Sequence, residues 1–312
     1  MKRLVLLFFI LSPLVGVRAD GMVEAKTMMG MKIKTWTAGL KQRNEIPNPM
    51  TGGTIVTITR VDKGVQWTID LQLKVYDEKP IALPYQKNST EAEMINSAKQ
   101  GNAEKAPKLE IRKTDRTRMI AGFSATSYEV KADGKHSAEL WLTPYTPMLE
   151  QMDKETREFG EAHTRELYKN YPAAERKEME VGMSMMAGMV KGQLPAQASS
   201  DLSKGYTLAM EGESSMETAV MDTMADRAPT APKGETSKKS TLYEVLSLTA
   251  DKINANQFEI PPSFKKVDDV AALQAQELMK AMMNGKGDGV NMEEMMKNLP
   301  KGATSGASQP DE

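Results

Sequence analysis

The chain contains no cysteine, and only two of its 312 residues are histidine. The absence of cysteine excludes disulfides, thiol catalysis, thiolate metal sites and a lipid-modified N-terminal cysteine. Aromatic residues are also scarce, at 5% of the chain, whereas methionine occurs 25 times. The sequence therefore has few of the residues that usually carry catalysis, and many copies of a flexible apolar residue.

The few candidate catalytic residues do not form a recognisable site. His136 neighbours Ser137, but adjacent residues of a strand point to opposite faces and make a poor nucleophile–base pair. His163 and Glu166 are three residues apart on a predicted helix and could share a metal, but a lone pair on a charged helix usually belongs to a solvated face. The chain has neither a Gly-x-Ser-x-Gly motif nor a glycine-rich phosphate loop. We therefore expect a protein that is not an enzyme and has no cofactor.

Residues 1–19 have the three parts of a secretory signal peptide. Lys2 and Arg3 precede an apolar run from Leu4 to Val15, and Ala19 supplies a small residue for cleavage. The run is shorter than the roughly 20 residues of a membrane span, and no later stretch approaches that length. We expect cleavage after about Ala19, a soluble periplasmic or secreted protein, and no membrane span.

The charges of the chain are nearly balanced. Removing residues 1–19 takes away Lys2, Arg3 and Arg18 from the 41 basic residues, which leaves 38 against 42 acidic ones, a net charge of −4. Nucleic-acid binding depends on a basic surface. The composition therefore gives no indication of a nucleic-acid partner.

The first strand-like region precedes Pro84. Thr54–Arg60 is rich in β-branched residues, and Asp62-Lys63-Gly64 is typical of a tight turn. After the turn, apolar and polar residues alternate with a period of two, which predicts a strand with one buried face. The predicted buried side chains are Val65, Trp67, Ile69 and Leu71.

The second strand-like region follows a polar stretch. Strands are expected at Leu109–Lys113, Phe123–Lys131 and Ser137–Thr143, the last two joined at Asp133-Gly134. Their predicted apolar face includes Tyr128, Val130 and Leu140. Further along, Gly205–Met210 and Thr218–Ala225 are expected to pair, and Ser240–Ile253 to form a long strand.

The patterns together predict an α+β fold: a curved, unclosed antiparallel sheet with a helical insertion and C-terminal helices. The expected parts are a signal peptide (1–19), a single curved-sheet domain (20–268), a helical insert (about 148–191) and a disordered loop (about 226–239). Methionine-rich helices (269–299) and a flexible tail (300–312) complete the chain.

The order of these segments resembles the exported family known as domain of unknown function 4412. The matching segments are Met31–Ile46, Thr59–Pro80, Thr117–Thr143, Gly205–Gly212, the strand-like segment at Ser240, and Phe258–Asp268. One departure is Ser263, because the family usually has glycine after this proline. The segment Asp62–Tyr76 is also similar to a hairpin of the LolA/LolB-type lipoprotein carriers. That resemblance implies an unclosed barrel around a hydrophobic cavity covered by helices.

Three functions fit this sequence. The first is non-enzymatic binding of a hydrophobic, lipid-like ligand or an envelope component, for which the candidate lining residues are Val65, Trp67, Ile69, Leu71, Tyr128, Val130, Leu140, Met183 and Met186. The second is copper binding, because thioethers select Cu(I); the candidate ligands are Met183, Met186, Met292, Met295 and Met296. The third is a structural or interaction module without a small ligand. Methionine stripes are more often packing residues than metal ligands.

Overall fold

Twelve strands form one sheet in the computed structural model, which describes residues 20–28, 30–48, 52–85, 109–132, 134–177, 205–213 and 239–283. The spatial order of the strands is β12-β6-β5-β4-β3-β2-β1-β11-β10-β9-β8-β7. The strands are β1 (Gly21–Thr27), β2 (Lys32–Ala38), β3 (Lys41–Pro47), β4 (Thr54–Arg60), β5 (Val65–Asp70), β6 (Val75–Pro80), β7 (Leu109–Ile120), β8 (Phe123–Ala132), β9 (Lys135–Pro144), β10 (Gly205–Glu213), β11 (Lys239–Thr249) and β12 (Lys265–Lys266).

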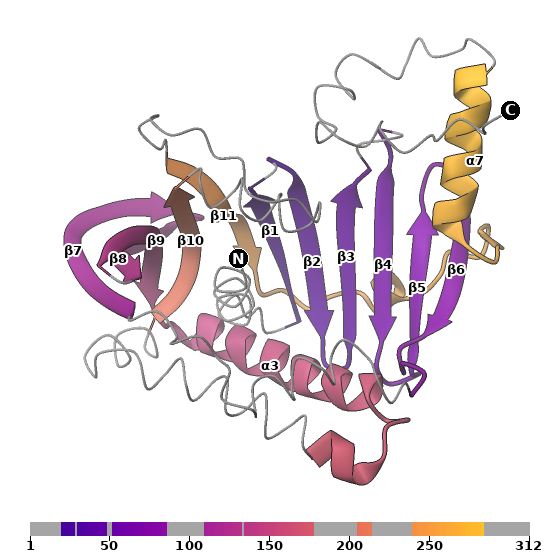
Figure 1. The fold of residues 1–312 in the computed structure, drawn as a ribbon, viewed down its shortest axis with the longest axis horizontal. Helices are drawn as coiled ribbons and strands as arrows, with labels where there is room; N and C mark the ends of the chain where they lie inside the picture. Colours follow the sequence, from indigo (N-terminus) through magenta and orange to yellow (C-terminus); the bar gives the residue numbers. More distant parts are fainter. Residues whose placement is uncertain are drawn as a thin grey trace, which may run out of the picture.

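The sheet is unclosed and almost entirely antiparallel, as the sequence predicts. Among the strands of the described segments, the short β12 is the only parallel member, and β12 and β7 are the two edges. Strands β1–β6 fan out side by side, whereas β7–β10 curl at the other end (Figure 1). Within the curl, Nη1 of Arg118 on β7 lies 2.7 Å from Oε1 of Glu211 on β10, although two strands separate β7 from β10. The side chains of Arg118 and Glu211 therefore lie on the inner face of the curl.

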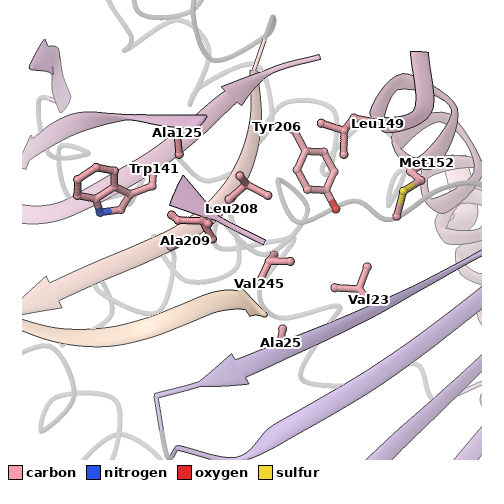
Figure 2. Packing of buried hydrophobic residues seen from close by; sticks show 11 residues of the cluster. Val23, Ala25, Ala125, Trp141, Leu149, Met152, Tyr206, Leu208, Ala209 and Val245 are labelled. Atoms are coloured by element: carbon pink, nitrogen blue, oxygen red, sulfur yellow. The ribbon is translucent and has the colours of Figure 1, made fainter. Parts of the chain in front are cut away.

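Helix α3 (Pro147–Leu167) lies across one end of the strands (Figure 1). Thr146 caps the helix by accepting a hydrogen bond from the backbone N–H of Leu149 at 3.3 Å, and Pro147 occupies the first turn. Its buried Leu149 and Met152 pack in a cluster with Val23 on β1 and with Trp141 inside the curl (Figure 2). We call the sheet face that carries α3 the helix face.

The opposite face is covered by residues 250–264, which we call the strap. The strap leaves β11 and passes behind the β1–β6 half of the sheet (Figure 1), and it contains the short helix η2 (Ala255–Phe258). Phe258 is 1% exposed and packs on a buried cluster of β4 and β5, whose members are Val56, Ile58, Trp67 and Ile69. This face is called the strap face. Its apolar surface is filled by the chain's own residues.

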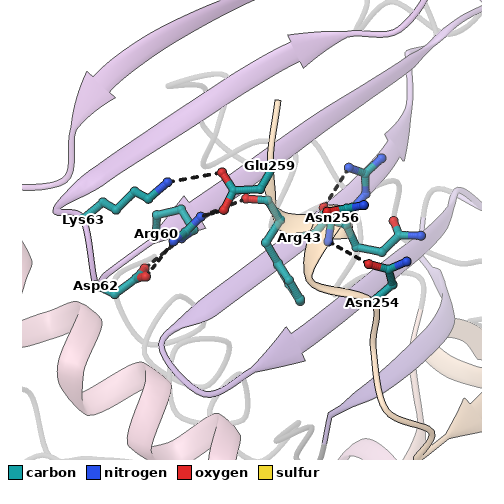
Figure 3. A network of polar contacts seen from close by, with 9 residues as sticks. Arg43, Arg60, Asp62, Lys63, Asn254, Asn256 and Glu259 are labelled. Atoms are coloured by element: carbon teal, nitrogen blue, oxygen red, sulfur yellow. Dashed lines mark hydrogen bonds and ion pairs between the residues drawn. The ribbon is translucent and has the colours of Figure 1, made fainter. Parts of the chain in front are cut away.

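Polar contacts fix the strap to the sheet (Figure 3). The buried Arg60 donates to Asp62 at 2.8 and 2.7 Å, to the carbonyl oxygen of Phe258 at 3.2 Å, and to Glu259. Arg43 donates to the carbonyl oxygen of Gln257 at 3.1 Å. Arg60 therefore fixes the strap at the point where the side chain of Phe258 enters the core.

Helix α7 (Val270–Met283) packs on the helix face beside β5 and β6. The backbone N–H of Val270 donates to Oδ2 of Asp77 at 3.0 Å, and Gln274 donates to Oδ2 of Asp70 at 2.6 Å. Both aspartates are 2% exposed. No helix in the described part of the chain is long and apolar enough to cross a membrane.

Several expected boundaries differ from the structure. β7 continues to Ile120 instead of ending at Lys113, because a register shift between Lys113 and Thr117 lets pairing with β8 resume. β10 pairs with β9 and β11, and the expected partner at 218–225 lies outside the described residues. Lys239, expected in a loop, opens β11.

The helical segments are described only in part. A second helical stretch begins at Ala173 and is described to Lys177, so the rest of the expected 148–191 insert lies outside the described residues. The expected signal peptide, the 226–238 part of the loop, residues 284–299 and the tail lie outside them as well.

Candidate binding face

A row of uncharged polar side chains crosses the helix face of β2–β5. The register places Thr35 opposite Asn44, Asn44 opposite Thr57, and Thr57 opposite Thr68. Directly opposed residues on neighbouring strands share one face of a sheet. All four are half-buried. We call Thr35, Asn44, Thr57 and Thr68 the polar row.

A second set of polar residues lies beside the polar row, nearer the strand ends that α3 crosses. Its members, opposed in the same way, are Thr37, Gln42, Thr59 and Gln66. Thr37 is 0% exposed and Thr59 is buried as well, whereas Gln42 and Gln66 are half-buried. The polar row is therefore the more accessible of the two sets.

Hydrogen bonds connect part of this polar surface internally. Thr35 Oγ1 donates to Asn44 Oδ1 at 2.8 Å, and Asn44 Nδ2 donates to Gln42 Oε1 at 3.1 Å. Among the described residues, the hydroxyls of Thr57 and Thr68 have no side-chain partner. The β4–β5 half of the polar row thus presents two hydroxyl groups that can donate and accept.

Isoleucines flank the polar row on its other side. Ile33 stands opposite Ala25 of β1, Ile46 stands opposite Ile55, and all three isoleucines are half-buried. Each isoleucine is two residues away from the member of the polar row on its own strand, so it shares the helix face with that row. The helix face of β2–β4 is consequently amphipathic, with a polar row next to an apolar one.

At the α7 end of this face, two buried carboxylates accept hydrogen bonds from backbone N–H groups. Asp70 Oδ1 accepts from the backbone N–H groups of Gln72 and Leu73, each at 2.8 Å. Asp77 binds the N-terminus of α7 through Oδ2, and its Oδ1 has no hydrogen-bond partner among the described residues. No group of three His, Asp or Glu side chains that could hold a metal exists in the described part of the chain.

The predicted hydrophobic lining residues do not share one surface. Val65, Trp67 and Ile69 lie on the strap face and pack with Phe258. Leu71 is 37% exposed and follows the end of β5, so its predicted place on that face is wrong: the strand ends at Asp70, whose side chain caps the following turn.

Tyr128, Val130 and Leu140 form a separate buried cluster on β8 and β9. Their side chains alternate along these strands with Ser127 and Trp141 of the curl interior, so they lie on its outer face. Among the described residues, the two predicted lining groups therefore belong to separate cores.

The predicted methionine ligands cannot be placed. Met183, Met186, Met292, Met295 and Met296 all lie outside the described residues, so copper binding and the lining roles of Met183 and Met186 stay predictions. His163 is half-buried, stacks on the ring of Phe159, and burial lowers its pKa. Glu166 instead forms an ion pair with Lys169.

The curl contains a second polar network, built on arginines of β7. Arg116 Nη2 lies 2.6 Å from Glu139, which also accepts from Ser127. Arg118 stacks over Trp141, and Nε and Nη2 of Arg118 and Nε1 of Trp141 have no hydrogen-bond partner among the described residues. Because each arginine is matched by a glutamate, the network has no excess charge to attract an ion.

Sequence reasoning predicted that one face of β5 is buried and did not identify the polar row on the other face. The available signal was the repetition of threonine in Lys32–Ala38, Thr54–Arg60 and Val65–Asp70. These residues can be recognised as one surface only once the strand register is known, because pairing across four strands aligns the members of the polar row.

Comparison with known proteins adds little to this description. No family model matches the chain, and no curated protein matches it. Among solved structures, the chain is similar to an uncharacterised conserved protein from Thermus thermophilus, with 7% sequence identity and a TM-score of 0.32. The match covers 86% of this chain and 99% of the other. A similarity at this level carries no functional argument.

Proposed function

We propose that this protein is an exported, non-enzymatic binding protein, and that an envelope component binds on its helix face over the polar row. The observation that carries the proposal is the alignment of Thr35, Asn44, Thr57 and Thr68 across four strands on a half-buried surface. Half-buried hydroxyl and amide groups next to isoleucines offer a ligand both hydrogen bonds and apolar contact.

The proposal includes the resemblance to the LolA/LolB-type carriers, but with a different kind of ligand surface. Their fold implies a hydrophobic surface beneath the helices, whereas the helix face of this chain carries Thr, Asn and Gln side chains on β2–β5. The strongly apolar face is closed by Phe258. We therefore propose a ligand that has polar groups along its length, in place of a bare acyl chain.

Isotope-edited NMR of the mature protein tests this proposal. The probes are a soluble digest of cell-wall glycan, phospholipid vesicles and a medium-chain fatty acid, each titrated separately. Shifts of amides in β2–β5 with any probe support binding on the helix face. Shifts confined to the strap and Phe258 would place a hydrophobic ligand on the other face, and no shifts with any probe would overturn the proposal.

A blocking variant makes the test specific to the surface. Thr57→Arg places a long charged side chain in the polar row, and we expect it to abolish binding. Thr117→Arg is the matched control, because Thr117 is an exposed strand residue of β7 at the far end of the sheet. Equal loss of binding in both variants would show that the effect is not local.

A further inference from the structure

We infer that the ligand of the helix face is a neutral polyhydroxylated chain, an oligosaccharide of pyranose units that lies across β2–β5. This inference rests on the proposed function and names its ligand class. The structural juxtaposition behind it is a row of four uncharged hydrogen-bonding side chains next to a row of isoleucines.

The chemistry of the polar row matches that of sugar hydroxyls. Threonine hydroxyls donate and accept hydrogen bonds, and the asparagine amide does both with different atoms. A sugar hydroxyl has the same dual character. The four residues carry no charge, and Thr57 and Thr68 have hydroxyls without a side-chain partner among the described residues.

The spacing of the row suits a repeating ligand. Neighbouring strands lie about 4.8 Å apart, so the row presents one polar side chain at about that interval. One pyranose unit of an extended chain has a similar length. An oligosaccharide that crosses the strands at right angles can therefore place a hydroxyl group beside each member of the polar row, from Thr35 to Thr68.

The isoleucine row supplies the other half of the match. Ile33, Ile46 and Ile55 are half-buried beside the polar row. Pyranose rings have apolar faces of C–H groups and polar rims, so a ring above both rows can contact isoleucine and hydrogen-bond at once. Removing that apolar area from water favours binding.

Two other ligand classes fit less well. An acyl chain over the polar row would desolvate its hydroxyls without giving them partners, which is unfavourable. An anion would need a free cation, but Lys79, at the β6 end of the face, is ion-paired with Asp77 at 3.6 Å and Asp269 at 3.1 Å.

Calorimetric titration with uncharged β-1,4-linked oligosaccharides of two to six units tests the inference. We expect affinity to rise with each unit up to about four, the number of strands in the row, and then to level off. Affinity that does not depend on length, or no binding by any member of the series, would overturn the inference. If NMR still showed another probe on the helix face, the proposed function would stand while the sugar assignment failed.

Conservative variants identify the contacts. Thr57→Val and Thr68→Val keep the β-branched shape that strands favour and remove only the hydroxyl. We expect each to weaken oligosaccharide binding by about three- to tenfold, the effect of one lost hydrogen bond. Thr117→Val is the control and should bind like the parent protein. Unchanged affinity in the Thr57 and Thr68 variants, with native thermal unfolding, would contradict the assigned contacts.

Discussion

Arg118 lies over the indole ring of Trp141, with its guanidinium carbon 4.3 Å from the ring centroid. The same guanidinium forms an ion pair with Glu211 at 2.7 Å. Because these residues come from β7, β9 and β10, one side chain connects three strands of the curl. Trp141 is buried and the side chain of Arg118 is 34% exposed, so the contact is partly shielded from water, where charged and aromatic groups interact more strongly than at a fully exposed site.

We predict that Arg118→Met destabilises the protein by about 1–2 kcal/mol, through loss of the cation–π contact and the partly buried ion pair. Urea unfolding measures the change. Arg112→Met is the control: Arg112 lies on the same strand, is 78% exposed and is 3.4 Å from Glu129. Its loss should have an effect below about 0.5 kcal/mol. Equal effects of the two substitutions would show that the stacked arrangement adds nothing.

Phe258→Ala should destabilise the protein by about 3–5 kcal/mol, because it removes a fully buried ring that closes the strap-face core. Phe264→Ala tests a half-buried ring of the same strap and should cost less. Equilibrium unfolding of both variants gives the comparison. If Phe258→Ala cost no more than Phe264→Ala, the strap would not be anchored as described.

Stability should fall in acid through the contacts of Arg60. The hydrogen bond from Arg60 lowers the pKa of Asp62 below its ordinary 3.8. Burial raises the pKa of Glu259, but its bonds to Arg60 and Lys63 outweigh burial and leave that pKa below 4.5. A carboxyl group with a lowered folded-state pKa stabilises the fold above its ordinary value and loses this contribution as the pH falls through the folded pKa.

We therefore expect the free energy of unfolding to decrease as the pH falls below about 4.5, the ordinary pKa of Glu259, and urea titrations between about pH 6 and 3 measure this. Arg60→Met should flatten that dependence, and Asp62→Asn should flatten it in part. A dependence on pH that is identical in the parent and both variants would show that other carboxylates are responsible.

Thr146→Ala should destabilise the protein by about 1 kcal/mol, because it removes the side chain that caps α3. Thr146→Ser keeps the capping hydroxyl and should retain most of the stability. Thermal unfolding of the pair distinguishes loss of the cap from loss of the methyl group. A Ser variant as unstable as the Ala variant would argue against the capping role.

Local patterns were sufficient for the coarse fold. Alternation in Val65–Asp70 predicted a strand with one buried face, and Trp67 and Ile69 are buried as expected. The same pattern could not place Leu71, because the end of β5 depends on the Asp70 side chain accepting two backbone hydrogen bonds. The continuation of β7 to Ile120 depends on an irregularity in pairing that has no simple sequence signal.

The candidate site was less predictable than the fold. Thr35 and Thr68 are distant in the sequence. They are aligned on one face of the sheet only through the registers of β3 and β4, which lie between their strands. No local pattern indicated that residues 250–264 cover the apolar face, because their few buried groups include a single phenylalanine without periodicity. Which face the helices cover is a property of tertiary packing and was beyond local patterns.

The edges of the sheet also affect how the protein behaves among its own copies. β12 offers only two residues, both lysine, and β7 carries Arg112, Lys113, Arg116 and Arg118 along an edge interrupted by a register shift. A second copy that tried to extend the sheet would meet a strand of only two residues at β12 and an interrupted ladder at β7, and both features disfavour pairing between edges. The open ends of this twelve-stranded sheet therefore resist the addition of further strands, which a long, flat and regular edge would favour.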